Sequence, residues 1–568
     1  MDDVTLSFLM MVTLLVLAAL LMNQYRKYRL RHYSVPIWDS SKGHRFYMVD
    51  MFPSLTYCNI EEKRLSNGAE CEACGICVDD HNMKEANKTI PCKATSIKAD
   101  VLQHHWVRGN LPPYTHCLVC SIECGMHLAL TDLRCAWCKN SVHDVCATKA
   151  DLCDLGRFRK LIIPPHCIEV KWVGVKGTRQ RRLVVKKLRH PQIDDWSPLI
   201  VIANRKSGSN EGQLILRHFR QHLNPAQVID IHDISPQNAL EWCNLLPEVT
   251  FTLLVCGGDG TIGWVLSAIE NLQLMNSPRI CILPLGTGND LSRVLGWGEG
   301  YSGDVDVSAI LEKIELSRAV NLDRWSVHIK DSKHIPFYQH YKTYSMNNYL
   351  SFGVDALVTL NFHRQRESWP AVFTHRLINK VCYFTYGTKD VLERECKDLH
   401  KKLKVELDGR EIELPELEGV VVLNISSWGG GCQPWGNNPE PNMTEPSNHN
   451  PMSYAHIHTP HSTICEHRNT TEDLCGLSCT YFYSCTWDGL YDDGKLEVMG
   501  LFSSFHIAQL QVGLATPLRL GQAQNIKITL HGGNTPMQID GEPWEQHPAT
   551  ITITRKGQAA MMALSSPT

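Results

Sequence analysis

The chain has no surplus of basic residues. Its 56 Lys and Arg are outnumbered by 59 Asp and Glu, so the formal net charge is -3 at pH 7. A general nucleic-acid-binding protein usually carries a strong basic excess, and no basic or acidic tail supplies one here. The charge balance therefore argues against nucleic acid as a partner.

The glycine-rich turns lack the two standard nucleotide-binding patterns. VCGGDGTIGWVL, residues 255–266, looks like a strand that breaks on glycines and restarts as a helix, as phosphate-binding turns do. It fits neither G-x-x-x-x-G-K-S/T nor G-x-G-x-x-G, and it places Asp259 where a phosphate would lie. The turn therefore needs a different account of how it would hold an anion.

A disulfide framework is not expected either. The 568 residues suggest about three to five domains with cores of their own. Of the 23 cysteines, 12 fall between Cys58 and Cys153, mostly in C-x-x-C pairs among histidines, which indicates zinc rather than disulfides. Zinc thiolates imply a reducing compartment, so we expect the body of the chain to face the cytosol.

An uncharged apolar run stands at the N-terminus. Val4–Met22 spans 19 residues, just long enough at about 1.5 Å per residue for a hydrocarbon core of about 30 Å. Asp2 and Asp3 precede it and basic residues follow it, which is the reverse of a secretory signal. The positive-inside rule predicts a single anchor with the chain that follows it in the cytosol, and we expect the membrane to be that of the endoplasmic reticulum or the plasma membrane. A re-entrant hairpin or a buried core helix is the open alternative.

The composition changes along the chain divide it into regions. We expect an anchor and basic stub at 1–32, cysteine-rich blocks at 44–92 and 104–153, a basic linker at 154–195, an alternating strand and helix region at 196–335, a β-rich region at 336–556 and a tail at 557–568. Within the linker, residues 170–190 hold eight Lys or Arg and no acid, which suits either binding to anionic lipid or a solvated linker. Residues 436–484 are rich in Asn, Pro, Thr, Ser and His and predict a disordered insertion.

Three apolar runs predict buried parallel strands. PLIVIANRKSG, FTLLVCGGDG and ICILPLGTGND each end in a polar, glycine-rich loop, and helical segments lie between them. Such alternation predicts a parallel sheet with helices on its faces and ligands at the carboxyl ends of the strands. Runs beyond residue 340, such as LEGVVVLNIS and ATITITR, predict a mainly antiparallel second lobe.

The loops after these strands are the candidate phosphate-binding sites. Glycines leave backbone N–H groups pointing inward, and a following helix adds its positive N-terminus. One G-G-D-G could be an ordinary tight turn, but three comparable loops at successive strand ends favour phosphate. The candidate nucleotide-binding residues are Asn204, Ser207, Gly208, Gly257, Gly258, Gly260, Thr261, Gly286, Thr287, Gly288, Asn289 and Asp290.

The second cysteine-rich block carries eight potential zinc ligands, enough for two four-coordinate sites. Their order resembles the diacylglycerol and phorbol-ester type of zinc finger, in which the two sites interleave. The resemblance implies one site from His104, Cys135, Cys138 and Cys153, and another from Cys117, Cys120, His143 and Cys146.

The first block is a partial copy of the second. On the same spacing His44, Cys71, Cys74 and Cys92 keep one site. The other keeps only Cys58, because Glu61, Asp79 and Asn82 replace its partners, although Cys77 or His81 could substitute. One thiolate with mixed oxygen ligands would hold zinc weakly. We therefore expect about three structural Zn²⁺ ions.

The longer motifs resemble a known family. GGDGTIGWVL, PLGTGNDLSRVLGWG, MNNYLSFGVDA, LNISSWGGG and MQIDGEPW are similar to those of eukaryotic diacylglycerol kinases, and the fingers with the apolar N-terminus make the epsilon type the closest match. The resemblance runs from the anchor to about residue 556. It implies a membrane helix, two zinc fingers, an α/β nucleotide-binding lobe and an antiparallel β-sandwich accessory lobe, with the active site between the lobes.

The resemblance also implies an activity. The enzyme would phosphorylate the 3-hydroxyl of 1,2-diacylglycerol with ATP to give phosphatidic acid, lower diacylglycerol signalling and feed phosphatidylinositol resynthesis. The epsilon type is associated with arachidonoyl-containing diacylglycerol. Diacylglycerol, ATP and membrane lipid are thus the expected partners.

Phosphoryl transfer needs positive charge, and with no P-loop lysine we expect Mg²⁺ to supply it. We assign Asp259, with Asp492 or Asp493, to the Mg²⁺ network. The resemblance makes Asp540 the base, oriented by Glu542, while the competing assignment makes Asp259 the base. Open alternatives for the whole chain are a sphingolipid, ceramide or dinucleotide kinase, or an inactive membrane-tethered zinc-finger adaptor.

Overall fold

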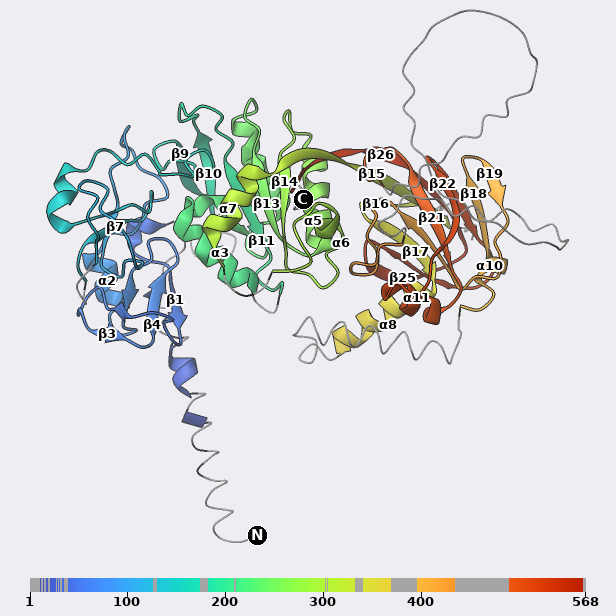
Figure 1. Ribbon diagram of the computed structural model, residues 1–568, viewed down its shortest axis with the longest axis horizontal. Helices are drawn as coiled ribbons and strands as arrows, with labels where there is room; N and C mark the ends of the chain where they lie inside the picture. The colour runs from blue at the N-terminus through green and yellow to red at the C-terminus, as the bar shows by residue number, and fades with distance from the viewer. Residues whose placement is uncertain are drawn as a thin grey trace, which may run out of the picture.

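The computed structural model describes residues 39–125, 130–173, 182–208, 211–301, 303, 305–331, 341–368, 396–434 and 490–564, with scattered positions before residue 39. Most of the predicted anchor at Val4–Met22 and the whole insertion at 436–484 lie outside the described residues. Among those described, no helix has both the length and the apolar character that crossing a membrane requires. Figure 1 shows three parts in a row: a cysteine-rich region, an α/β lobe and a β-rich lobe.

The α/β lobe is built on four parallel strands, as the apolar runs predict. They lie in the order β12 (Val228–Asp230), β11 (Leu199–Ala203), β13 (Thr252–Gly257) and β14 (Arg279–Pro284). The registers pair Leu199 with Thr252 and Thr252 with Arg279. Nearly every side chain of these strands is buried, which is why the runs are continuous rather than alternating.

Helices cover both faces of this sheet. Ile215 and Phe219 of α3 (Glu211–His222) and Ile310 of α7 (Val307–Leu316) pack on one face, while Val265 of α5 (Asp259–Leu272) packs on the other. Shorter helices complete the lobe: η3 (Pro225–Gln227), α4 (Pro236–Leu240), η4 (Glu241–Leu245) and α6 (Asp290–Val294).

Two long strands join the α/β lobe to the β-rich lobe. β15 (Arg318–Asp331) and β26 (Ala549–Ala563) pair along their whole length, and Met561 of β26 also pairs with Ile280 of β14. The sheet then continues through β23 (Ile526–Leu530), β18 (Leu403–Leu407) and β19 (Arg410–Ile412), with β16 (Tyr341–Met346) beside β15. Figure 1 shows the pair spanning both lobes.

The predicted tail at 557–568 is therefore wrong for its first seven residues. The boundary at residue 556 falls inside β26, and Met561 and Ala563 are buried in the core of the α/β lobe. The sequence near residues 557–563 does not show the hydrophobic alternation of a strand clearly. The strand forms because it pairs with β15, which lies more than 200 residues earlier in the chain.

The β-rich lobe is a sandwich. Its second sheet is antiparallel, in the order β22 (Leu518–Ala523), β21 (Leu496–Leu501), β20 (Gly419–Leu423), β17 (Tyr349–Gly353), β24 (Thr535–Ile539) and β25 (Glu542–Gln546). Trp325, Phe352 and Val405 belong to the core between the two sheets. The described residues of this lobe include the helices α8 (Val354–Ser368), α10 (Leu399–Lys402) and α11 (Ser504–Gln511).

Two small β-rich units form the cysteine-rich region. Finger 1 contains η1 (Ser40–Lys42), β1 (Phe46–Val49), β2 (Thr56–Tyr57), β3 (Arg64–Leu65), β4 (Gly68–Cys71), β5 (Cys77–Val78) and α2 (Met83–Thr89). Finger 2 contains β6 (Trp106–Arg108), β7 (Leu133–Cys135), β8 (Ser141–Val142) and η2 (Asp144–Lys149). Asn110 links them, because its side chain bonds the backbone N–H and C=O of Tyr57.

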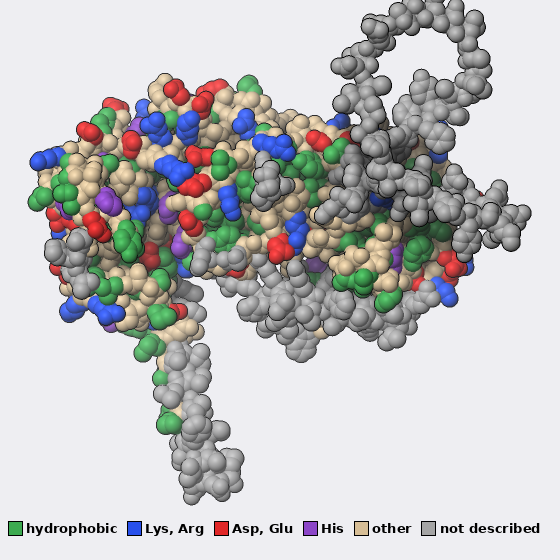
Figure 2. All heavy atoms as spheres, in the orientation of Figure 1, with side chains coloured by type: hydrophobic (Ala, Val, Ile, Leu, Met, Phe, Trp, Pro, Cys, Tyr) green, Lys and Arg blue, Asp and Glu red, His purple; other side chains and the backbone are tan. Residues whose placement is uncertain are grey.

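The segment expected as a linker is folded onto the α/β lobe. β9 (Ile168–Val173) and β10 (Arg182–Leu188) form an antiparallel hairpin, and Ile168 and Leu188 join the core of that lobe. Trp196 is also buried and donates its indole N–H to the carbonyl of Ile162. The apolar positions were hidden among the basic residues, whose side chains appear over this hairpin in Figure 2.

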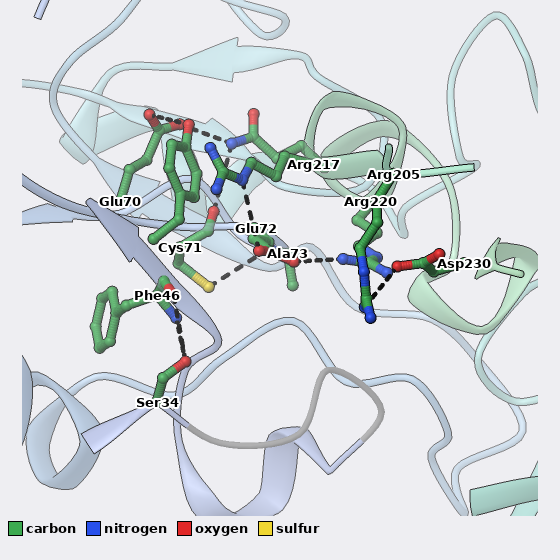
Figure 3. Close-up of polar contacts among 12 residues, drawn as sticks. Ser34, Phe46, Glu70, Cys71, Glu72, Ala73, Arg205, Arg217, Arg220 and Asp230 are labelled. Carbon is green, nitrogen blue, oxygen red and sulfur yellow. Dashed lines mark hydrogen bonds and ion pairs between the residues drawn. The ribbon is translucent and has the colours of Figure 1, made fainter. Parts of the chain in front are cut away.

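Both fingers dock against the C-terminal end of α3. Figure 3 shows Glu72 of finger 1 between Arg217 and Arg220 of the helix, with Glu72 Oε2 accepting from Arg220 and its Oε1 3.7 Å from Arg217 Nε. Lys93, fully buried, donates to the carbonyls of Arg220, Gln221 and Leu223 at 3.3, 2.9 and 2.8 Å. These contacts cap the negative end of the helix with a cation.

Candidate active site

A cavity of about 610 Å³ lies between the α/β lobe and the β-rich lobe. Both lobes contribute to its walls. The α/β lobe supplies Gly258, Asp259, Gly260, Gly286, Thr287, Gly288 and Asp290; the β-rich lobe supplies Asn348, Tyr349, Thr359, Phe362, His363, Gly429, Gly430, Gly431, Cys432, Gln511, Asp540, Gly541 and Glu542. The carboxyl ends of β13 and β14 thus open into this cleft, as expected of a parallel sheet.

Two glycine turns form the floor of the cleft by packing backbone against backbone. A Cβ added at Gly286 would lie 2.7 Å from the Cα of Gly258, and one added at Gly258 would lie 3.1 Å from the Cα of Gly286. Leu285 N–H donates to the carbonyl of Gly257 at 3.0 Å, which ties the turns together. Any side chain at either glycine would separate the turns, so the pattern of glycines follows from this close approach.

Asp259 is held by the second turn. It begins α5, and its carboxylate accepts from the backbone N–H groups of Asp290 at 3.1 Å and Leu291 at 3.4 Å. Asn289 adopts the left-handed conformation there, with φ 55°, and its side-chain amide donates to the carbonyls of Gly286 and Glu299. The anion in the glycine turn is therefore satisfied in part by the N-terminus of α6.

Asp290 joins the two lobes across the cleft. Its carboxylate accepts from the Ser427 hydroxyl at 2.7 Å and from the backbone N–H groups of Gly430 and Gly431 at 3.1 and 3.0 Å. Those donors belong to the S-W-G-G-G loop that follows β20. Asp290 was predicted to touch the nucleotide, and the structure also gives it this connecting contact.

Asp540 lies at the tip of the β24–β25 hairpin. Asp540 and Gly541 both have positive φ, at 48° and 84°, as a two-residue Asp-Gly hairpin turn requires. The Asp540 carboxylate accepts from the N–H groups of Asn347, Asn348 and Tyr349 at 2.8, 2.8 and 3.1 Å, and from the Asn347 side chain at 3.0 Å. Burial nevertheless raises its pKa.

Glu542 does not orient Asp540, contrary to the prediction. The four donors to Asp540 come from Asn347, Asn348 and Tyr349. Glu542 instead faces the first glycine turn, because a Cβ built on Gly260 would lie 3.7 Å from its Oε1. The carboxylate of Glu542 therefore reaches across the cleft toward the loop that holds Asp259.

The cleft has a strong negative bias. Asp259, Asp290, Asp540 and Glu542 line it, and the described lining includes no Lys or Arg. Burial, reinforced by the charges of Asp290 and Asp540, raises the pKa of Asp259 to about 7. An anionic ligand such as a nucleotide phosphate would require a cation in this cleft to offset the repulsion.

Three sets of predicted residues lie outside the cleft lining, the first being Gly257, Thr261 and Asn289, which belong to the glycine turns themselves. Asn204, Ser207 and Gly208 follow β11, and Asn204 N–H donates to the carbonyl of Cys256 in β13 at 3.2 Å, so they adjoin the floor of the cleft. Asp492 and Asp493 lie in a turn beside the Asp323 and Arg555 ion pair, where Gly494 N–H donates to Asp323 at 2.6 Å. The structure does not bring this turn to Asp259.

Two motifs that hold carboxylates of the cleft are visible in the sequence, but their role could not be predicted from it. Asn347 and Asn348, which hold Asp540, stand in M-N-N-Y-L-S-F-G-V-D-A, and Gly430 and Gly431, which hold Asp290, stand in L-N-I-S-S-W-G-G-G. Both motifs belong to the resemblance. Their partners lie more than 130 residues away in the chain, so spacing could not pair them.

The structure brings the predicted zinc ligands together in three groups of four. In each group the ligand atoms lie within 4.8 Å of one another: His44, Cys71, Cys74 and Cys92; His104, Cys135, Cys138 and Cys153; Cys117, Cys120, His143 and Cys146. The Nε2 of His44 lies 2.9 Å from the carbonyl of Ile90 and that of His143 lies 3.1 Å from the carbonyl of Glu123. Donation there would leave Nδ1 to face the cysteines, as metal-binding histidines require.

The degenerate site of finger 1 is closed by hydrogen bonds. Cys58 Sγ accepts from the Asn82 side chain at 3.6 Å and from Asp79 N–H at 3.5 Å. Among the described residues, Cys58 belongs to no group of metal-ligating side chains. Asn82 thus occupies the position of a ligand and ties the loop without an ion.

Family comparisons match three parts of the chain. The catalytic domain of diacylglycerol kinases matches residues 198–322, their accessory domain matches 345–543, and the phorbol ester and diacylglycerol binding domain (C1 domain) matches 104–155. The C1 match coincides with finger 2, whose two zinc groups are complete.

Curated relatives cover most of this chain. Probable diacylglycerol kinase 3 of Caenorhabditis elegans is 33% identical over 549 residues, which is 92% of this chain and 65% of that protein. Diacylglycerol kinase 2 of Arabidopsis thaliana is 30% identical over 603 residues, with 87% and 78% covered. A solved structure described as a diacylglycerol kinase from Bacillus anthracis is 15% identical with a TM-score of 0.35, and covers 65% of this chain and 97% of its own. The first of these relatives extends well beyond the matched region.

Proposed function

This chain belongs to the diacylglycerol kinase family, and on that premise we propose that it uses ATP to phosphorylate the 3-hydroxyl of a 1,2-diacylglycerol, giving phosphatidic acid. The observation that carries the proposal is the cleft between the lobes, where paired glycine turns face buried carboxylates. The turns suit phosphate groups and the carboxylates suit a metal ion and a hydroxyl. Both are needed to move a phosphoryl group to an alcohol.

The carboxylates of the cleft fit a hard divalent cation such as Mg²⁺. The described lining has carboxylate oxygens and no Lys or Arg, so backbone donors and hydroxyls are the main groups that offset the negative charges there. Asp290 and Asp540 are occupied by backbone donors, whereas Glu542 faces the glycine turn. We propose that Glu542 meets the ion, with Asp259 beside it. Bound Mg²⁺ would neutralise charge on the nucleotide phosphates.

The second role to assign is that of the general base. The number of hydrogen bonds that each aspartate already accepts helps to choose between Asp259 and Asp540. A carboxylate offers about four lone pairs, and Asp540 accepts four hydrogen bonds. Asp259 accepts two within the described part of the chain. Its pKa, raised to about 7, also suits proton transfer near neutral pH. These contacts favour Asp259 over Asp540 as the acceptor of the hydroxyl proton, with Asp540 fixing the Asn347–Tyr349 turn.

The finer identity also belongs to this proposal. Two fingers before the catalytic lobe and the apolar run Val4–Met22 support an epsilon-type kinase held in a membrane of the endoplasmic reticulum or cell surface, with the catalytic part cytosolic. A preference for arachidonoyl-containing diacylglycerol and a role in phosphatidylinositol resynthesis go with that type. The glycine loops that would bind phosphate are intact, which supports an active kinase rather than an inactive zinc-finger adaptor.

An assay on mixed micelles tests the function. Incubating the full chain with ATP, Mg²⁺ and either diacylglycerol or sphingosine is expected to yield phosphatidic acid alone, and chelating Mg²⁺ is expected to abolish the product. Comparing arachidonoyl-containing with saturated diacylglycerol tests the acyl preference. Product from sphingosine, or none from diacylglycerol, would reject the proposed activity.

We propose three structural zinc ions, one in each group of four ligands. Metal analysis of the purified chain is expected to return three Zn²⁺ per molecule, and Cys74→Ser to remove one. Cys58→Ser serves as the matched control and should leave three, because Asn82 already bonds that thiol. A result of four zinc ions, or of two for Cys58→Ser, would contradict the count.

A further inference from the structure

We propose that α11 and its two flanks form a surface that inserts into the near leaflet of a lipid bilayer. The entrance of the active-site cleft would then face that leaflet. The surface, here called the α11 patch, consists of Phe502, Phe505, Val512 and Leu514. The proposal rests on the proposed function, because a lipid substrate must pass from a bilayer into the cleft. The patch is exposed in the folded chain, and its partner is a lipid surface rather than another protein.

The patch is too apolar for an ordinary helix surface. Phe505 is 60% exposed and Leu514 is 77% exposed, with Phe502 and Val512 at 46% and 64%. Four large apolar side chains within 13 consecutive residues exceed the scattered exposure that soluble surfaces show. Figure 2 shows hydrophobic side chains at the lower edge of the β-rich lobe, where Figure 1 places α11.

The exposure is not the result of a loosely held segment. Ile507 and Leu510 on the opposite side of α11 are buried with Leu423 and Met499 of the sheet. Ser503 caps the helix by accepting from His506 N–H, and His506 Nε2 lies 3.1 Å from the carbonyl of Thr516. One face of α11 is thus fixed to the lobe, which leaves Phe505 pointing away from it.

The patch adjoins the cleft. Gln511, the last residue of α11, lines the cavity, and the carbonyl of Leu510 accepts from the thiol of Cys432, which also lines it. A lipid whose acyl chains stay among other lipids at Phe505 and Leu514 would meet the cleft at Gln511. This continuity favours a bilayer, because a protein partner on the same surface would cover the entry for the substrate.

The N-terminal side of the chain faces the same way. Leu21 and Met22 are 62% and 66% exposed. Figure 1 draws the described residues before η1 below finger 1, on the side of the picture on which α11 lies. Arg26 pairs with Asp50 at 2.9 Å, which places the exposed Met51 next to the helix. Apolar side chains at both ends of the molecule therefore share one side, as contact with a flat bilayer requires.

The test separates membrane contact from catalysis. Hydrogen exchange of the full chain is measured with and without phosphatidylcholine vesicles, in the absence of ATP and diacylglycerol, so that no activity is needed. We expect residues 502–514 to exchange several-fold more slowly with vesicles. Exchange of this segment that is unchanged by vesicles would overturn the proposal, even if the kinase proved active.

Activity supplies the second readout. Phe505→Ser combined with Leu514→Ser is expected to lower phosphorylation of diacylglycerol in vesicles about tenfold and to leave phosphorylation of a dispersed short-chain diacylglycerol unchanged. Leu316→Ser, at an 80% exposed leucine that ends α7, is the matched control and should change neither. Full vesicle activity of the double variant would contradict the proposal, whereas no activity on either substrate in the unaltered chain would reject the proposed function alone.

Discussion

Asp259→Asn is expected to lower kcat by about 10²- to 10⁴-fold, the range that a general base contributes, with little change in thermal stability. The substitution removes the carboxylate whose remaining lone pairs face the cleft. The pKa of Asp259 is raised by burial and by Asp290 and Asp540, so its negative charge is disfavoured in the folded chain. A neutral amide of the same shape relieves that repulsion but turns its NH2 toward one of the two backbone donors, so the two effects oppose each other and Tm should change little.

Asp540→Asn should lower stability more than Asp259→Asn does. An amide nitrogen would replace an oxygen that accepts two hydrogen bonds from Asn347, Asn348 or Tyr349. Leaving two donors facing another donor costs about 2–5 kcal/mol, so Tm should fall and the cleft should lose its shape. Asp493→Asn is the matched control in a turn outside the cleft lining, and it should leave kcat and Tm unchanged.

Steady-state kinetics and a thermal melt on the three variants decide between the assignments. If Asp540→Asn keeps its stability and its nucleotide affinity but loses turnover, Asp540 is the base. If Asp259→Asn keeps turnover but needs much more Mg²⁺, Asp259 belongs to the metal and our choice of base is wrong.

Lys93→Met is expected to free the fingers from the catalytic lobe. The buried ammonium of Lys93 donates to three carbonyls at the end of α3 and lies 4.4 Å from the centre of the Trp137 ring. Removing the ammonium takes this donor from the carbonyls of Arg220 and Leu223, a loss of about 1–3 kcal/mol for each buried group left unsatisfied, while the carbonyl of Gln221 keeps the ammonium of Lys139 at 2.7 Å. The lysine contacts both Trp137 of finger 2 and the end of α3, so its removal should weaken the docking that the Glu72 contacts and the Lys139 contact with Gln221 also support.

Calorimetry and limited proteolysis measure this effect. We expect the variant to show a separate, earlier transition for the fingers and faster cleavage between finger 2 and the α/β lobe. Lys88→Met, at a solvent-exposed lysine in α2, is the control and should melt like the unaltered chain. A single transition at an unchanged temperature for Lys93→Met would show that the Glu72 contacts with Arg217 and Arg220 suffice for docking.

The sequence predicted those parts of the molecule whose residues lie close together in the chain. The zinc groups are those that the resemblance implies, and the C-x-x-C pair in each group is local because two neighbouring cysteines can chelate one ion. The glycine turns also follow, because a buried strand followed by glycines and a helix fixes where the loop lies in a parallel sheet. Even the loss of the fourth site could be expected from Glu61, Asp79 and Asn82.

Roles that depend on distant partners could not be predicted. The Asp492 and Asp493 turn was expected at the metal because it is acidic, yet it lies beside Asp323 and Arg555. Asp540 was expected to rely on Glu542, two residues away, but its four donors come from the turn at Asn347 almost 200 residues earlier. Likewise the basic segment read as a linker buries Ile168 and Leu188 only because the core of the α/β lobe is there to receive them.

By itself the amino-acid sequence determined the family, the zinc ligands and the glycine turns, since each depends on residue types at short, fixed spacings. Only the tertiary structure decided which carboxylates share the cleft and which groups hold each of them. It also decided that β26, near the C-terminus, completes the sheet of the α/β lobe. The physical reason is that burial and backbone hydrogen bonds set the charge and the available lone pairs of Asp259 and Asp540. Both depend on segments that meet only when the two lobes pack together.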